Sequence, residues 1–268
     1  MPAINNSQQL YKILAIGDIV GPAALEALCG QLFKLRNDFG ASVVVVNGEN
    51  ACNGNGLDSV SARALFGAGV DVITSGNHIW HKRDIKQFLE DCPNLIRPVN
   101  YPPVCPGNGS VIAECDGKKV LVINALGTVF MDPFDNPFDA VERVLERESG
   151  RYDYSVLDIH AEATSEKLAV ANYFDGRINA IFGTHTHVQT SDNRILPNGS
   201  GYITDLGMTG PPDSILGIKT EIIIEKFKTH MPVKFEVAEG PIEIQGALFK
   251  LGKNTGRAIE VERIKVVL

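Results

Sequence analysis

Short, almost continuously apolar runs alternate with longer segments of helical periodicity through the first third of the chain. The apolar runs are typical of buried strands, because valine and isoleucine pack well on a pleated surface; they lie at 12–17, 42–47 and 71–75. Residues with helical spacing of apolar side chains follow them, at 23–39, 59–68 and 83–91. This strand–helix alternation predicts a parallel sheet that is covered on both faces.

The remainder of the chain adds signs of antiparallel pairing. Residues 111–115 and 119–124 flank Asp116-Gly117, which predicts a hairpin, and residues 131–137 form a loop rich in Pro, Asp and Phe. The other expected elements are helices at 138–148 and 165–173, buried strands at 154–159 and 179–182, and half-buried strands at 233–238, 242–251 and 258–266. No linker rich in Pro, Gly or Ser divides the chain. We therefore expect a flexible extension over residues 1–10 and a single α/β domain, built on two sheets, over residues 11–268.

Composition narrows the class of protein. The 268 residues are 44% hydrophobic, which is enough for a sizeable core. A net charge of -7 argues against a dedicated nucleic-acid binder, although an anionic substrate stays compatible, since bound divalent cations would reverse the local field. The polar N-terminus and the lack of an apolar run of ~18 residues predict a soluble protein with no membrane partner.

The cysteines argue against a structural zinc site or a redox motif. Their number, five, is odd, and no CxxC pair occurs. Scattered thiols of this kind fit a reducing compartment, so we expect a cytoplasmic location.

Groups that can bind a metal ion or a proton follow five of the expected strands. They are Asp18, Glu49 with Asn50, Asn77 with His78, Asp158 with His160, and His185 with His187. The carboxyl ends of parallel strands form the ligand crevice of an open α/β sheet. The sequence therefore predicts one polar cluster at one edge of the sheet.

Each of these groups alone has an ordinary structural explanation. An Asp after a strand commonly caps a helix or forms a turn, and Glu49-Asn50 alone is typical of a turn. His185 and His187 give a stronger signal, because imidazoles two residues apart in an extended segment face the same side. Thr184 and Thr186 would then face away from them. It is the coincidence at five strand ends that favours a functional site.

The residue types indicate which metal ions such a site would take. Carboxylate, amide oxygen and imidazole suit manganese, iron or zinc, and the lack of a thiolate argues against structural zinc. The cluster offers more ligands than one tetrahedral ion with an open position can use. Two ions that share a bridging carboxylate fit better, and two-metal sites of this kind generate hydroxide at neutral pH.

The same motifs, in this order, resemble the metallophosphoesterase (calcineurin-like) superfamily and, more narrowly, the YmdB family of bacterial metallophosphoesterases. The resemblance runs from about Lys12 to the C-terminus. It is carried by IGDIVG (16–21), NGENACNGNGL (47–57), TSGNHIWHKRDI (74–85), DIHAEATSEKLA (158–169), GTHTHVQTSDNRILPNGSGYITDLGMTGP (183–211) and FKTHMPVKFEVAEG (227–240).

The resemblance implies a fold and a set of residue roles. The fold is a four-layer αββα sandwich, with two mixed β-sheets flanked by helices. Asp18 and His187 are the implied ligands of the first metal ion, with Asn50 nearby. Asn77, His160 and His185 are the implied ligands of the second ion, and Glu49 would bridge the two ions. His78 would lie beside the phosphate, as the catalytic proton donor to the leaving oxygen or as a charge stabiliser.

The implied activity is hydrolysis of phosphodiesters by a hydroxide that bridges two divalent metal ions. The expected substrates are 2′,3′-cyclic nucleotides, with RNA ends as a further candidate, and the family also implies dimers or tetramers. Two alternatives stay open: a regulatory nucleotide-binding module with only slow hydrolysis, and a two-metal hydrolase of amides or carboxylic esters.

The first motif departs from the wider superfamily pattern. The usual Asp-x-His is here Asp18-Ile19-Val20, and the usual bridging Asp is Glu49. Both changes are shared by YmdB-type enzymes. They leave the first ion one imidazole short, which favours iron or manganese, with zinc and magnesium as the other candidates. Two further histidines have structural interpretations, His81 as a surface residue and His230 as a helix cap.

Overall fold

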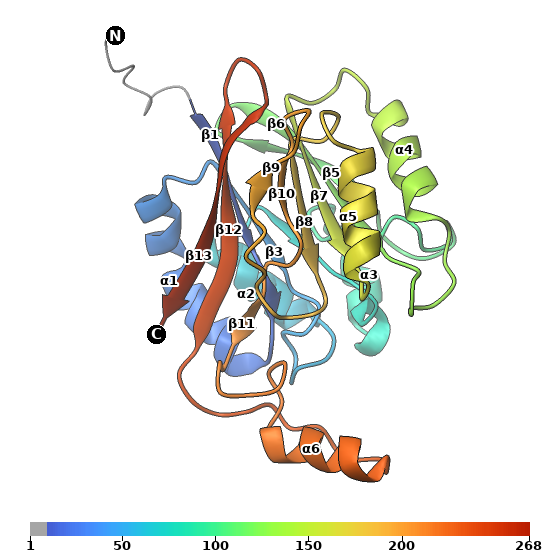
Figure 1. Ribbon diagram of the computed structural model, residues 1–268, viewed down its shortest axis with the longest axis vertical. Coiled ribbons are helices and arrows are strands. Elements are labelled where there is room, and N and C mark those ends of the chain that lie inside the picture. The colour runs from blue at the N-terminus through green and yellow to red at the C-terminus, as the bar shows by residue number, and fades with distance from the viewer. Residues whose placement is uncertain (1–9) are drawn as a thin grey trace.

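Two β-sheets pack face to face in the computed structural model, which describes residues 10–268 (Figure 1). The first sheet has the order β2-β11-β12-β1-β3-β4, with β13 beside β12, and the second has the order β5-β6-β7-β8-β10-β9. The strands of the first sheet are β1 (Leu10–Ile16), β2 (Asp18–Ile19), β3 (Val43–Asn47), β4 (Val72–Thr74), β11 (Met208–Gly210), β12 (Glu243–Gly252) and β13 (Ala258–Val267). Those of the second are β5 (Ser110–Cys115), β6 (Lys118–Leu126), β7 (Tyr154–His160), β8 (Ala180–Thr184), β9 (Arg194–Ile195) and β10 (Gly201–Ile203).

Helices cover the two outer faces. The helices are α1 (Pro22–Phe39), α2 (Ser59–Ala68), α3 (Ile85–Asp91), α4 (Pro137–Arg147), α5 (Thr164–Tyr173) and α6 (Thr220–Thr229), with a short 3-10 turn at Ile79–His81. The buried side chains of α1, α2 and α3 pack on the first sheet, and those of α4 and α5 pack on the second. The four-layer sandwich predicted from the resemblance is confirmed.

Alternation along the strands produces these layers. In β1, Ile13 and Ala15 belong to the core between the sheets, whereas Leu14 and Ile16 belong to the core beneath the helices. Successive side chains of a strand point to opposite faces, so a strand that is apolar at every position must be buried on both. The continuous valine run of β3 is divided in the same way.

The parallel pairing predicted for the first third of the chain is present, since β1 pairs with β3 and β3 pairs with β4 in parallel. The sheets are mixed, since β1 pairs parallel with β3 but antiparallel with β12, and β5 pairs antiparallel with β6. The inner face of each sheet is covered by the other sheet rather than by helices. Apolar runs report burial on two faces but do not report what covers each face.

Most predicted elements are present within a residue or two. The turn of the predicted hairpin has positive φ at Asp116 and Gly117, 54° and 70°. The strand predicted at 233–238 is absent, and only Val237 makes an isolated bridge, to Ile218. The predicted N-terminal extension, apart from Leu10 in β1, lies outside the described residues. None of the helices in residues 10–268 is long and apolar enough to cross a membrane.

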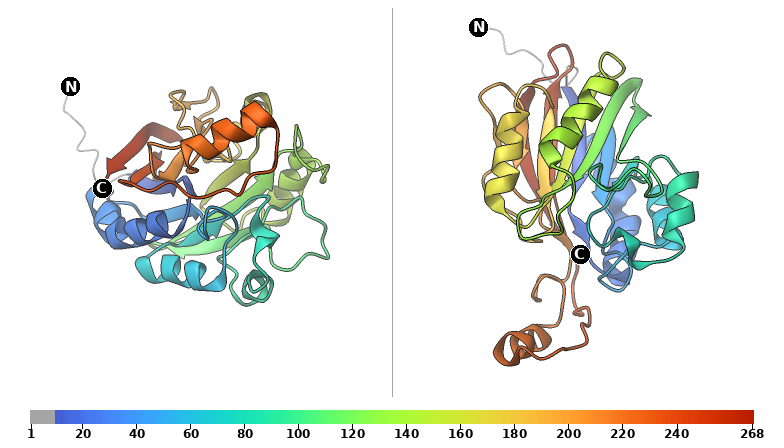
Figure 2. Two further views of the ribbon diagram at one scale, coloured as in Figure 1. Left: turned by 90° about the horizontal axis from the view of Figure 1, so that it is seen from below. Right: turned by 90° about the vertical axis from the view of Figure 1, so that its right-hand side faces the viewer.

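Residues 211–241, here called the α6 arm, project from one end of the sandwich (Figures 1 and 2). At its root the two extended segments bond to each other, from Lys219 N to Glu236 O at 3.0 Å and from Ala238 N to Gly217 O at 2.9 Å. His230 ends α6 in the left-handed conformation, so it occupies the predicted cap position. The arm stands at the end where β1, β3, β7 and β8 finish (Figure 1).

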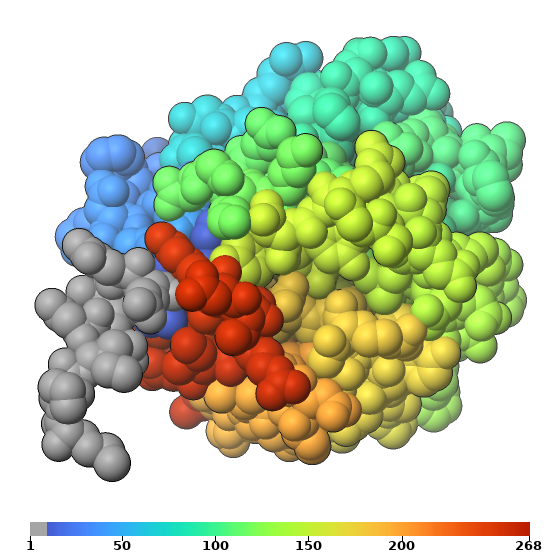
Figure 3. All heavy atoms as spheres, turned by 90° about the horizontal axis from the view of Figure 1, so that it is seen from above, coloured from blue at the N-terminus to red at the C-terminus, as the bar shows by residue number. Residues whose placement is uncertain are grey.

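At the opposite end, the turn between β12 and β13 ties the first sheet to the second (Figure 3). Asn179 donates to Gly256 O at 2.8 Å, and the Tyr154 hydroxyl donates to Lys253 O at 3.1 Å. This end is therefore fixed by direct bonds between the sheets, and the strand ends that carry polar groups lie away from it.

Candidate active site

The polar groups predicted at five strand ends do meet. Glu49 follows β3, Asn77 follows β4, His160 is the last residue of β7, and His185 follows β8. One nitrogen from each histidine and one Glu49 oxygen lie within 4.8 Å of one another. His160 Nε2 is 3.2 Å from Glu49 Oε1, 3.1 Å from Asn77 Oδ1 and 3.1 Å from His185 Nδ1. Four potential ligand atoms from both sheets thus surround one point.

A second group of potential ligands adjoins the first through Glu49. Asp18 Oδ1 lies 3.6 Å from His187 Nε2. Asn50 Nδ2 donates to Glu49 Oε1 at 3.2 Å and lies 3.4 Å from the same His187 nitrogen. Glu49 therefore lies between the two groups, which is the position that a bridging carboxylate requires.

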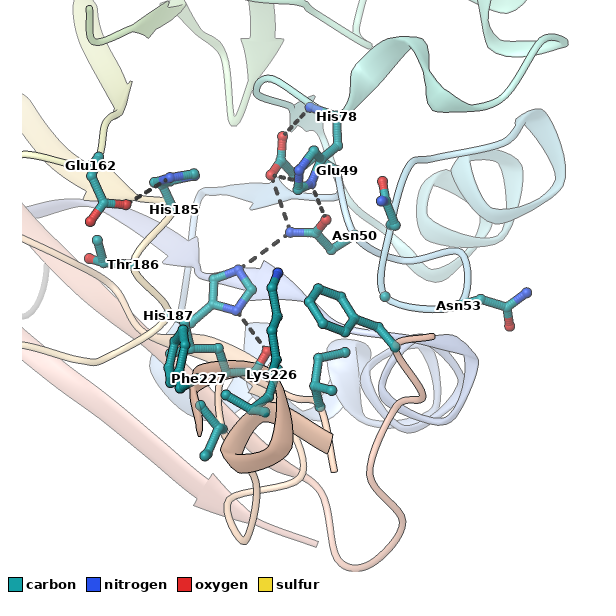
Figure 4. Close-up of a pocket in the computed structure, with 17 residues that line it drawn as sticks. Glu49, Asn50, Asn53, His78, Glu162, His185, Thr186, His187, Lys226 and Phe227 are labelled. Carbon is teal, nitrogen blue, oxygen red and sulfur yellow. Dashed lines mark hydrogen bonds and ion pairs between the residues drawn. The ribbon is translucent and has the colours of Figure 1, made fainter. Parts of the chain in front are cut away.

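His78 lies at the edge of this cluster and faces the pocket (Figure 4). Its backbone N–H donates to Glu49 Oε2 at 3.1 Å, and its Nδ1 lies 2.8 Å from Asn50 Oδ1. An amide oxygen only accepts, so Nδ1 carries the proton in this hydrogen bond. That leaves Nε2 as the ring atom available to a substrate.

The electrostatics of the cluster are those of a cation site. Burial alone would raise the pKa of Asp18, but contact with His187 holds this pKa well below its ordinary value. Burial would lower the pKa of His160, yet Glu49 and Asp18 raise it to about 9. Burial and the neighbouring His160 lower the pKa of His185 to about 3. The carboxylates are thus ionised and His185 is neutral, which are the forms that bind cations.

Buried hydrogen bonds behind the cluster fix the orientation of His160. Thr184 donates to Asp158 Oδ1 at 2.7 Å, so its oxygen must accept from His160 Nδ1, 2.8 Å away. With Nδ1 held as a donor, His160 presents Nε2 to the other potential ligands, and loss of the Nε2 proton would free its lone pair for a cation. Asp158 also accepts from Thr74 at 2.6 Å and from Asn47 at 3.1 Å, which joins the two sheets beneath the site.

The segment that carries His185 and His187 is a strained loop rather than a strand. Both residues have positive φ, 93° and 59°. The extended backbone that was predicted here is therefore absent, although both side chains line the same pocket. His185 lies beside His160, and His187 lies beside Asp18.

A buried ion pair holds this loop in place. Lys167 and Asp205 are fully buried and lie 2.8 Å apart. Thr186, between the two histidines, donates its hydroxyl to Asp205 at 2.6 Å and its N–H at 3.2 Å. The hydroxyls of Thr184 and Thr186 thus bond to the buried carboxylates of Asp158 and Asp205, although Thr186 also lines the pocket. No sequence motif pointed to the Lys167–Asp205 pair.

Comparisons with known proteins agree with this geometry. The YmdB-like protein family model matches residues 14–264. A 2′,3′-cyclic-nucleotide 2′-phosphodiesterase of Bacillus subtilis is 46% identical, over 95% of this chain and 97% of its own. The chain belongs to the YmdB-like family.

Solved structures of similar proteins share the whole fold. A hypothetical protein from Thermus thermophilus is 40% identical with a TM-score of 0.88, covering 96% of this chain and 99% of its own. A phosphatase of Mycoplasma pneumoniae is 35% identical with a TM-score of 0.90, covering 96% and 94%. This YmdB-like chain is therefore similar to them from end to end.

The residues present fit a pair of metal ions. Asp18 Oδ1 is buried without a hydrogen-bond partner among the described residues, which is unusual for a carboxylate and is expected of an atom reserved for a cation. Gly76 leaves the room that the ligands need, because a Cβ there would lie 2.3 Å from both Glu49 Oε2 and His160 Nε2.

The cluster forms one wall of a pocket of about 690 Å³ (Figure 4). Glu49, Asn50, His78, His185 and His187 line it, whereas His81 is exposed nearby, as predicted for a surface residue. Glu162 also lines it, and its Oε2 lies 3.1 Å from His185 Nε2. Glu162 was not predicted to lie at the site; its position two residues after His160, at the end of a strand, was the available signal.

Proposed function

We propose that this chain is a phosphodiesterase that uses two divalent metal ions to hydrolyse 2′,3′-cyclic nucleotides. The observation that carries the proposal is the convergence of carboxylate, amide and imidazole donors from both sheets at one wall of the pocket. The name and 46% identity of the Bacillus subtilis relative support the substrate class.

The proposed ligands form two groups. Asp18 and His187 would hold the first ion beside Asn50, while Asn77, His160 and His185 would hold the second, with Glu49 bridging. When bound, the ions supply an activated water and neutralise the non-bridging phosphate oxygens. Iron or manganese is proposed because the first group contains only one imidazole.

The chain's own residues orient the substrate relative to these ions. Water adds to phosphorus, the bond from phosphorus to O2′ breaks, and a proton passes to O2′, which leaves a 3′-phosphate. His78 lines the pocket; Asn50 accepts a hydrogen bond from Nδ1 of its ring, and the Glu49 carboxylate accepts one from its backbone N–H. We assign His78 as the catalytic residue beside the leaving oxygen, where its imidazolium form would donate a proton from Nε2 or stabilise the negative charge.

Several finer assignments belong to the same proposal and rest on the family resemblance. They are a single domain over residues 11–268, RNA ends as further substrates, and assembly into dimers or tetramers. A cytoplasmic location is proposed because the five cysteines are free.

Turnover of adenosine 2′,3′-cyclic phosphate with and without metal tests the function. We expect activity with Mn²⁺ or Fe²⁺, loss in EDTA, recovery on adding metal back, and at least a hundredfold lower kcat for His78→Ala. The matched control is His230→Asn, because this exposed histidine lies outside the pocket and Asn tolerates its positive φ.

Two outcomes would count against the proposal. A metal-loaded protein that hydrolyses carboxylic esters or amides but no phosphodiester contradicts it. Tight nucleotide binding with turnover far below ordinary enzyme rates would favour the regulatory alternative.

A further inference from the structure

The wall of the pocket opposite the metal-ligand cluster is apolar and is supplied by the α6 arm. Of the seven arm residues that line the pocket, six are apolar: Ile215, Leu216, Ile218, Ile223, Phe227 and Phe235. The pocket thus has one end rich in carboxylate, amide and imidazole groups and one end lined by aliphatic and aromatic side chains (Figure 4).

Both phenylalanine side chains of this wall are solvent-exposed. Phe227 is 69% exposed and Phe235 is 49% exposed, although phenylalanine is among the residues most often buried. Neither belongs to a core cluster within residues 10–268. Exposed apolar surface next to a polar site is characteristic of ligand-binding pockets, which combine an apolar lining with a few polar groups.

Lys226 is the seventh arm residue of the lining, and the only lysine or arginine among the lining residues in the described part of the chain. Its side chain points from α6 into the pocket (Figure 4). Its Nζ lies 4.5 Å from the centre of the Phe235 ring, and no ion pair of Lys226 is found among residues 10–268. A cation in this position faces the substrate rather than a protein carboxylate.

We propose that the α6 arm is the base-binding wall of the active site. Phe227 and Phe235 stack on the base of the nucleotide, and Lys226 contributes positive charge on the arm side of its phosphate. This inference rests on the proposed function, because it assumes that the phosphate occupies the metal end of the pocket.

The chemistry of the two walls favours a nucleotide over a simple phosphodiester. A nucleotide carries an anionic group and a planar aromatic ring on one rigid sugar, which matches a polar end and an aromatic end within one pocket. The arm offers no side-chain amide, hydroxyl or carboxylate to the lining, and Lys226 is its single polar group. A wall that stacks on the base without forming hydrogen bonds to it accepts every base. Purines should therefore bind more tightly than pyrimidines, and only because their ring system is larger.

Paired substrates test the proposal. Adenosine 2′,3′-cyclic phosphate carries the base, whereas methyl riboside 2′,3′-cyclic phosphate offers the same reacting group without it. For Phe227→Ala and Phe235→Ala we expect kcat/KM for the adenosine substrate to fall about tenfold or more through KM, with the base-free substrate unchanged within about twofold. Wild-type protein should prefer the adenosine substrate by a similar factor.

Ile224→Ala is the matched control, because Ile224 is 48% exposed on the same helix and does not line the pocket. It should leave both substrates unchanged. Binding of adenosine 3′-monophosphate, measured by calorimetry, should weaken in the two phenylalanine variants but not in Ile224→Ala.

The outcomes separate this inference from the proposed function. If the wild type hydrolyses neither cyclic phosphate, the proposed function fails. If it hydrolyses both equally well, or if the phenylalanine variants lose activity on both to the same extent, the base-binding role of the arm is overturned. A change in oligomeric mass in those variants, with both substrates equally affected, would instead make the arm a contact between copies.

Discussion

At the scale of single residues, the site depends on positions that leave no room for another side chain. Gly76 follows β4 and lies against Glu49 and His160, at distances that a Cβ atom could not share. Behind it, the single hydroxyl proton of Thr184 decides which nitrogen of His160 is free. Neither residue is itself a proposed metal ligand, yet both control the geometry of the proposed ligands.

Gly76→Ala should abolish activity without unfolding the protein. The added methyl group would displace Glu49 Oε2 or His160 Nε2, each 2.3 Å away, while the backbone of Gly76 has no positive φ that an alanine would strain. We expect a loss of at least about a hundredfold in kcat/KM and weaker metal binding, measured by steady-state kinetics and equilibrium dialysis.

Gly67→Ala is the control for this substitution. It lies within α2 with nothing within 4 Å of the added Cβ, so it should stabilise the helix by about 1 kcal/mol and leave activity unchanged. Normal metal affinity in Gly76→Ala would contradict the placement of Gly76 against the ligands.

Thr184→Val should weaken metal binding while keeping the volume of the side chain. Without the hydroxyl, His160 Nδ1 and Asp158 Oδ1 lose their common partner, and such partners are typically worth about 10–100-fold in metal affinity. Metal titration of the apoprotein measures the effect. Thr184→Ser keeps the hydroxyl and should restore most of the affinity, and equal affinity for all three proteins would disprove the role.

At the scale of elements, the fold was most predictable where burial alone decides the structure. The run 42–47 could be assigned because four consecutive valines, at positions 43–46, fit a strand buried on both faces. The short strands β2, β9, β10 and β11 were not predicted, because two or three residues carry no periodicity. The alternation at 233–238 was misread as a strand: Phe235 faces the pocket and Val237 packs at the root of the arm, without a sheet partner.

The candidate site, like the fold, could be predicted only in part. The convergence of its candidate metal-binding side chains could be predicted, because strand ends gather residues whose chemistry is evident from their type. The supporting groups could not, since nothing in the sequence around Lys167 or Asp205 indicates that these two residues are buried together. Positive φ at His185 and His187 likewise depends on that tertiary support rather than on local preference.

Lys167→Met tests whether this ion pair positions the loop between His185 and His187. The change leaves Asp205 buried without its cation, which typically costs about 3–5 kcal/mol. We expect lower stability in urea together with a fall in kcat at saturating metal, because Thr186 loses one of its two partners.

The double variant Lys167→Met/Asp205→Asn should recover part of the stability but not the kcat. Recovery of both would show that the pair has only a structural role. Lys118→Met is the control, since it removes an exposed ion pair with Asp153 and should change neither quantity.

At the scale of the whole molecule, cation binding and stability are coupled. Asp18 and Glu49 are completely buried; burial and the neighbouring Asp18 oppose the ionisation of Glu49, while contact with His160 keeps the pKa of Glu49 below its ordinary value. Ligands that bind only the folded state stabilise it by mass action. Metal ions bound at this site would therefore stabilise the folded state as well as take part in the proposed chemistry.

Adding Mn²⁺ to metal-free protein should raise the melting temperature. At a concentration about 100-fold above the dissociation constant the gain is about 2.7 kcal/mol, or roughly 5–10 °C for a chain of this size. Differential scanning calorimetry with EDTA reversal measures it. Glu49→Gln should reduce the shift by more than half, and a melting temperature that does not respond to any divalent cation would contradict the metal assignment.

The division of the donor set between the sheets has a consequence for folding. Asp18, Glu49 and Asn77 come from the first sheet, whereas His160 and His185 come from the second, so neither sheet carries the complete set before the two pack together. Binding of a paramagnetic cation during refolding would therefore report when the two sheets pack together. The donor set itself is the probe, because neither sheet alone has all the ligands and only the assembled protein does.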